Sequence, residues 1–126
     1  MKIAVVSDIH ANLAALQAVL ADIDAVAPDA VIWHTGDIVG YNAEPNEVVA
    51  LLRERGAAGV MGNHDAAVLG ELDVKWFNAA AAAAGRVHLF CRGCLDCMVA
   101  AALGWMREGG GGRRRRRRGE EENVMK

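Results

Sequence analysis

The sequence predicts an α/β fold in which helices cover a parallel sheet, with elements in the order β-α-β-α-β. Two observations predict it. Three short apolar stretches rich in β-branched residues alternate with two stretches of helical periodicity, and each apolar stretch ends in polar residues. Right-handed crossovers turn this order into a parallel sheet. The 126 residues suit one small domain.

The first strand and helix are predicted from residues 3–26. Residues 3–6 form an apolar run that ends at Ser7 and Asp8, as expected for a buried parallel strand. Apolar residues then recur at three- and four-residue intervals from Leu13 to Ile23, with Asn12 in the place of an N-cap. Pro28 lies beyond the end of this helix.

The remaining elements follow the same pattern. Residues 30–33 predict the second strand, residues 46–55 the second helix and residues 57–61 the third strand. Gly56 stands where a helix C-terminal cap is expected. The six alanines at residues 79–84 are expected to be helical by propensity.

Charge and composition exclude several classes of protein. The formal charge of −2 combines an acidic body with a basic tail that contains Arg113–Arg118, so a body built to hold nucleic acid is not expected. Neither a secretory signal nor a membrane-spanning run is recognisable. The three cysteines all lie within residues 91–97, which argues against a disulfide framework and favours the cytoplasm.

Polar clusters follow the three predicted strands. They are Asp8-Ile9-His10, Gly36-Asp37 and Gly62-Asn63-His64-Asp65. The carboxyl ends of parallel strands share one edge of the sheet, where ligands bind in open α/β folds. Carboxylate, imidazole and amide groups suit borderline transition metals. Taken singly, the first two clusters could be ordinary turns, but the third is hard to explain by packing.

Together the three clusters resemble the calcineurin-like metallophosphoesterase superfamily, in particular its small prokaryotic members. The loop from Gly36 to Tyr41 and the segment Pro45-Asn46-Glu47 are similar to theirs, and the resemblance covers residues 1–78. It implies that residues 1–84 form the N-terminal half-domain of an αββα sandwich. The second sheet of that sandwich is expected to be missing.

The resemblance also implies roles for individual residues. Asp8 and His10 would bind one metal ion, Asp37 would bridge two ions, and Asn63 would bind the second. His64 would assist at the phosphate, with Asp65 orienting its ring. The implied activity is hydrolysis of phosphate monoesters or diesters, nucleotides among the candidates, with manganese, iron, zinc or similar divalent ions. Two ions belong to the complete family site, and at most one is expected here.

An alternative hypothesis is a weak or inactive truncated fragment that folds by self-association, because the distal histidine ligands of the family are not recognisable. His34 is expected to be a satisfied core or rim residue, and His88 no ligand. Residues 85–108 are interpreted as an atypical segment followed by a helix, and residues 109–126 as a disordered tail. Neither the cysteines nor the arginine run is interpreted as a site.

Overall fold

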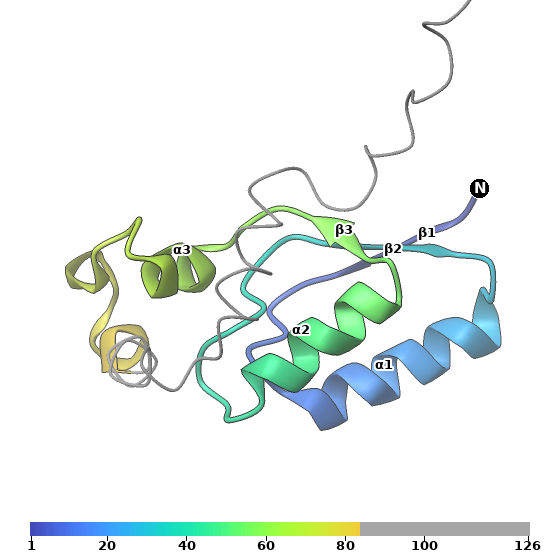
Figure 1. Cartoon of the computed structure of the whole chain (residues 1–126), viewed down its shortest axis with the longest axis horizontal. Helices are drawn as coiled ribbons and strands as arrows, with labels where there is room; N and C mark the ends of the chain where they lie inside the picture. The colour runs from blue at the N-terminus through green and yellow to red at the C-terminus, as the bar shows by residue number, and fades with distance from the viewer. Residues whose placement is uncertain (84–126) are drawn as a thin grey trace, which may run out of the picture.

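The computed structural model describes residues 1–83 (Figure 1). The elements run β1 (Ile3–Val6), α1 (Leu13–Val26), β2 (Val31–His34), α2 (Pro45–Glu54), β3 (Ala58–Gly59), α3 (Asn63–Leu69) and a 3-10 turn, Val74–Trp76. Residues 79–83 are again helical, as the alanine run predicted. The predictions for residues 85–126, with those for His88 and the cysteines, lie outside the described residues.

The strands form one parallel sheet in the order β1-β2-β3. Val6 pairs with His34, which in turn pairs with Gly59, so the three strands end side by side. The predicted α/β class and the parallel β-α-β-α-β arrangement are therefore confirmed. The described residues contain this one three-stranded sheet.

Both long helices lie on one side of the sheet (Figure 1). Leu16 and Leu20 of α1 pack with Val48 and Leu52 of α2 and with Ile32 of β2 in a single buried cluster. Burying these side chains is the main favourable contribution to folding this layer. The predicted N-cap of α1 is confirmed, because the Asn12 side chain accepts a hydrogen bond from the backbone N–H of Ala15 at 3.0 Å.

The opposite face of the sheet is apolar and exposed. Alternate residues of β1 and β2 point to opposite faces. Val5 is 63% exposed and Trp33 is 50% exposed, whereas Ile32 between Val31 and Trp33 is buried. This is the face on which the predicted sandwich would place a second sheet.

The elements differ from the predictions at several points, and α2 is Pro45–Glu54 instead of residues 46–55. β2 is Val31–His34 instead of residues 30–33, because His34 still pairs with both neighbouring strands. β3 is only Ala58–Gly59, since the chain leaves the ladder after Val60 to pass close to Asp37. The third polar cluster does not lie in a loop: Gly62 is the N-cap of α3, and the other three residues form its first turn.

Candidate metal centre

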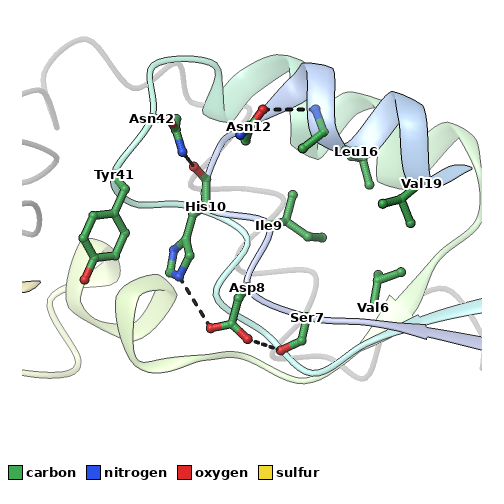
Figure 2. A pocket seen from close by; sticks show the side chains of 11 residues that line it. Val6, Ser7, Asp8, Ile9, His10, Asn12, Leu16, Val19, Tyr41 and Asn42 are labelled. Carbon is green, nitrogen blue, oxygen red and sulfur yellow. Dashed lines mark hydrogen bonds and ion pairs between the residues drawn. The ribbon is translucent and has the colours of Figure 1, made fainter.

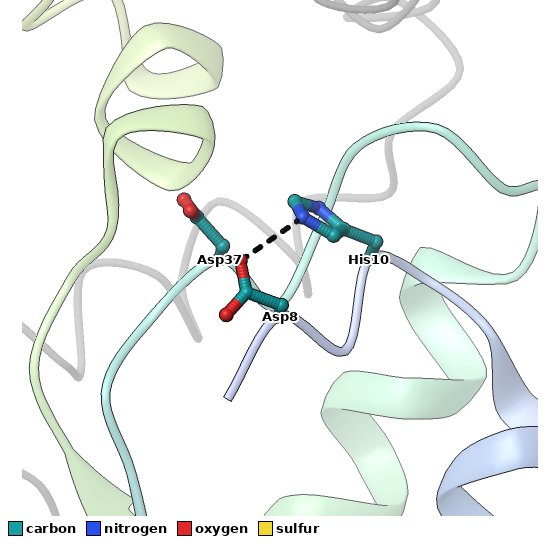
Figure 3. A group of neighbouring side chains, drawn as sticks. All are labelled: Asp8, His10 and Asp37. Atoms are coloured by element: carbon teal, nitrogen blue, oxygen red, sulfur yellow. Dashed lines mark ion pairs between the residues drawn. The ribbon is translucent and has the colours of Figure 1, made fainter. Parts of the chain in front are cut away.

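The first two predicted clusters meet at the carboxyl ends of β1 and β2. One ligand atom each from Asp8, His10 and Asp37 lies within 4.8 Å of the others. His10 Nε2 is 3.5 Å from Asp8 Oδ1 (Figure 3). Two carboxylates and one imidazole at this spacing form a donor set that suits a borderline divalent cation. The residues present therefore fit the metal that the sequence predicted.

His10 is held in the orientation that a metal ligand needs. Its Nδ1 is 3.1 Å from the carbonyl oxygen of Val39. An N–H at Nδ1 donates to that carbonyl, so Nε2 keeps its lone pair for a cation. The same arrangement, a ring fixed through its second nitrogen, is typical of metal-binding histidines.

Asp8 is held by a short chain of hydroxyl groups. The Thr35 hydroxyl donates to Ser7 Oγ at 2.6 Å, and the Ser7 hydroxyl donates to Asp8 Oδ2 at 2.5 Å. Thr35 follows β2 and Ser7 follows β1, so the chain connects the ends of the two strands. The sequence prediction missed both residues. A hydroxyl residue beside each acidic cluster was the available signal.

The backbone around the cluster is strained. Asp8, His10 and Asp37 have φ angles of 53°, 49° and 51°, in the left-handed region that non-glycine residues rarely adopt. Such conformations persist only where the surrounding structure imposes them, and they concentrate at functional sites. All three candidate ligands share this property.

The third cluster reaches the site through close backbone contact. A Cβ on Gly62 would lie 2.2 Å from Asp37 Oδ1, and a Cβ on Gly36 would lie 2.2 Å from Gly62 N. Asp37 Oδ1 accepts a hydrogen bond from the backbone N–H of His64 at 2.9 Å. The Asp37 carboxylate is directed toward the start of α3 (Figure 3). Asn63 follows Gly62 directly, and the ligand role of its exposed side chain stays a prediction.

The His64 ring packs among other rings beside the cluster. It is 5% exposed. Its centroid lies 5.1 Å from that of His10, 4.9 Å from Tyr41 and 5.0 Å from Phe77. Gly40 makes room for it, because a Cβ there would lie 2.7 Å from His64 Nδ1. The structure thus places the predicted catalytic histidine next to a predicted metal ligand. The sequence prediction assigned no site role to Tyr41 or Phe77.

Asp65 is fully buried, and its described hydrogen bonds run to backbone groups. Oδ1 accepts from the N–H groups of Ile38 and Val39, and Oδ2 accepts from the N–H of Gly62. Burial raises the pKa of the Asp65 carboxyl, and these three donors act against that rise. The predicted role of Asp65 toward the His64 ring stays a prediction.

His34 is a core residue, as expected, and is 2% exposed. Within residues 1–83 neither ring nitrogen meets hydrogen-bond geometry, so the expectation of a satisfied side chain is wrong. Burial lowers the pKa of His34, while the charge of Asp65 and the nearby Val60 backbone act in the other direction. His34 is not among the three residues that converge as candidate ligands.

A pocket of about 370 Å³ adjoins the cluster (Figure 2). Asp8 and His10 belong to both the pocket and the cluster. The wall toward α1 is apolar and includes Val6, Leu16 and Val19. A small ligand could therefore enter beside the candidate metal position.

The chain belongs to the calcineurin-like phosphoesterase family, whose sequence model matches residues 1–123. The chain is also similar to a metallophosphoesterase of known crystal structure from Sphaerobacter thermophilus. The two share 39% identity with a TM-score of 0.57, and the match covers 85% of this chain and 40% of that one.

A second relative is the uncharacterized protein MJ0912 of Methanocaldococcus jannaschii. It is 53% identical over 76 residues, which are 60% of this chain and 31% of that protein. The chain thus spans 31% and 40% of the lengths of these two relatives. No helix within residues 1–83 has the length and apolar character needed to cross a membrane.

Proposed function

We propose that this chain binds a divalent cation through Asp8, His10 and Asp37 and hydrolyses phosphate esters at that site. The observation that supports the proposal most strongly is the convergence of the three ligand atoms within 4.8 Å. The orientation of His10 by Val39 and the family membership support it independently.

A divalent cation at this position would supply Lewis-acid polarisation of the phosphoryl oxygens and activation of water. The residues of the chain would have separate roles in binding that cation. Asp8 and Asp37 would compensate the cation's charge with their carboxylates, and His10 would offer the lone pair of Nε2. The amide oxygen of Asn63 is proposed as a further ligand.

His64 is proposed to assist at the scissile phosphate. Its ring lies beside His10, so it would be close to a phosphoryl group held at the cluster. A protonated ring nitrogen of His64 would donate a hydrogen bond to a phosphoryl oxygen or pass its proton to the leaving oxygen. Packing against Phe77 and Tyr41 limits the ring's freedom.

The proposed substrates are phosphate monoesters or diesters, nucleotides among them, and manganese is the first ion to test. The test is hydrolysis of bis(p-nitrophenyl) phosphate with and without Mn²⁺, by the wild type and by Asp37→Asn. We expect metal-dependent hydrolysis that Asp37→Asn abolishes. Hydrolysis that needs no metal, or that Asp37→Asn leaves unchanged, would overturn the proposal.

A further inference from the structure

Within residues 1–83, Asp65 is the one buried carboxylate. It occupies the first turn of α3 and is 0% exposed. An ionised carboxylate is very costly to bury unless hydrogen-bond donors surround it. The hydrogen-bond donors to Asp65 therefore show which segments its carboxylate joins.

Those partners are three backbone N–H groups on two separate segments. Asp65 Oδ1 lies 2.9 Å from the N–H nitrogen of Ile38 and 3.1 Å from that of Val39. Asp65 Oδ2 lies 2.9 Å from the N–H nitrogen of Gly62. The first two donors belong to the loop after β2, and the third is the N-cap of α3. One carboxylate thus joins the loop after β2 to the start of α3.

Each of these donors stands next to a candidate ligand. Ile38 directly follows Asp37, and Gly62 directly precedes Asn63. The Val39 N–H donates to the Asp65 carboxylate, and the Val39 carbonyl oxygen accepts from His10 Nδ1. The hydrogen-bond partners of Asp65 are therefore adjacent along the backbone to Asp37 and Asn63, and one of them also contacts His10.

We propose that Asp65 is a positioning residue that sets metal affinity by holding the backbone of Ile38, Val39 and Gly62. This inference rests on the proposed function of the Asp8, His10 and Asp37 cluster. It assigns Asp65 an effect on cation binding, whereas an orienting role toward the His64 ring would affect turnover alone. The two roles predict different results for the same variant.

The test is the Mn²⁺ affinity of Asp65→Asn, measured by calorimetry on protein whose fold is checked by circular dichroism. Asparagine keeps one acceptor oxygen but presents an amide N–H₂ where the other carboxylate oxygen accepted a bond. We expect the affinity to fall by about tenfold or more, the usual effect of disturbing the groups that orient metal ligands. The matched control is Asp22→Asn on the exposed surface of α1, which should keep the wild-type affinity.

A second control separates positioning from simple loss of stability. Gly56 has a φ of 62°, and a Cβ added there would meet no atom within 4 Å, so Gly56→Ala strains the backbone without touching the site. Gly56→Ala should lower the melting temperature and leave Mn²⁺ affinity unchanged. An Asp65→Asn protein that folds, keeps its Mn²⁺ affinity and loses only turnover would overturn the proposal in favour of the orienting role.

A measurement on the wild type covers the case in which Asp65→Asn does not fold or the wild type binds no Mn²⁺. Nuclear magnetic resonance detects scalar couplings across hydrogen bonds. We expect such couplings from the carboxyl carbon of Asp65 to the amide nitrogens of Ile38, Val39 and Gly62. If they are absent, the proposal is wrong. If they are present in a protein that neither binds Mn²⁺ nor hydrolyses esters, the proposed function fails and Asp65 holds the two segments without a role in cation binding.

Discussion

Asp37 Oδ1 accepts a hydrogen bond from the backbone N–H of His64 at 2.9 Å, joining a proposed metal ligand to the proposed catalytic histidine. The bond requires the loop after β2 and the start of α3 to approach at backbone distance. Gly36 and Gly62 allow that approach, because a Cβ on either would collide with the other segment.

The close approach predicts that Gly62→Ala damages the site. A Cβ at Gly62 would lie 2.2 Å from Asp37 Oδ1 and 2.3 Å from Asp37 N, so the two segments must separate. We expect a loss of roughly 1–3 kcal/mol in unfolding free energy, as for other overpacked positions, together with weaker Mn²⁺ binding. Urea unfolding and calorimetry measure the two effects. Gly56→Ala is the control, and equal Mn²⁺ affinities in the two variants would contradict the prediction.

His64→Ala separates catalysis from metal binding. The ring lies beside His10 but is assigned to the phosphate, so its removal should leave Mn²⁺ affinity nearly unchanged. Turnover should fall by roughly two to four orders of magnitude, the usual contribution of a general acid. Steady-state hydrolysis and calorimetry on the same preparation check both statements. Unchanged turnover, or loss of the ion, would show that the role is misassigned.

The hydroxyl chain to Asp8 predicts a smaller effect on metal binding. Thr35→Val removes the hydroxyl that donates to Ser7. Ser7, which donates to Asp8, is then fixed by one hydrogen bond fewer. We expect Mn²⁺ affinity to fall by up to about tenfold, the lower end of the range for groups that orient metal ligands, because these hydroxyls are exposed. Thr35→Ser keeps the hydroxyl and should restore the affinity. If Thr35→Val and Thr35→Ser have the same Mn²⁺ affinity, the Thr35 hydroxyl has no role in metal binding.

The burial of His34 predicts a loss of stability in acid. Burial lowers the pKa of its imidazole below the ordinary value of 6.5, so the folded state favours the neutral ring. As the pH falls below 6.5, His34 becomes protonated in the unfolded chain before it does so in the folded protein. The stability that His34 contributes is therefore complete above pH 6.5 and is lost as the pH falls toward the lower folded pKa.

Urea unfolding in the presence of a chelator, at about pH 7.5 and about pH 5.5, measures this loss. His34→Leu fills the same core position without a titrating group. Asp65 is present in both proteins, so its titration contributes to both. The wild type should lose more stability than His34→Leu between the two pH values. Equal losses would mean that His34 does not titrate in this range.

The arrangement of the strands could be predicted because local pattern and chain topology agree. The β-branched run of residues 3–6 and the periodic stripe from Leu13 to Ile23 each have one reasonable structural interpretation. Parallel strand ends then bring Asp8, His10 and Asp37 together, so the convergence of the first two clusters followed from topology.

The contacts that tie the site together could not be predicted from local pattern. The Asp65 carboxylate bonds backbone groups 26 and 27 residues earlier, and no periodicity encodes that contact. The helical start at Asn63 was missed for a similar reason. Gly62 has no side chain to signal an N-cap, and the cap is formed by Asp65 bonding back to the Gly62 N–H.

Asp8, His10 and Asp37 are proposed to bind a divalent cation. The most direct measurement is Mn²⁺ titration by calorimetry of the wild type, His10→Ala and the surface control Asp22→Asn. Because the converging donor set contains three residues, we predict that the wild type binds at most one ion, weakly. His10→Ala should lose that ion and Asp22→Asn should keep it. Binding that survives His10→Ala unchanged, or two tightly bound ions per chain, would contradict this account of the site.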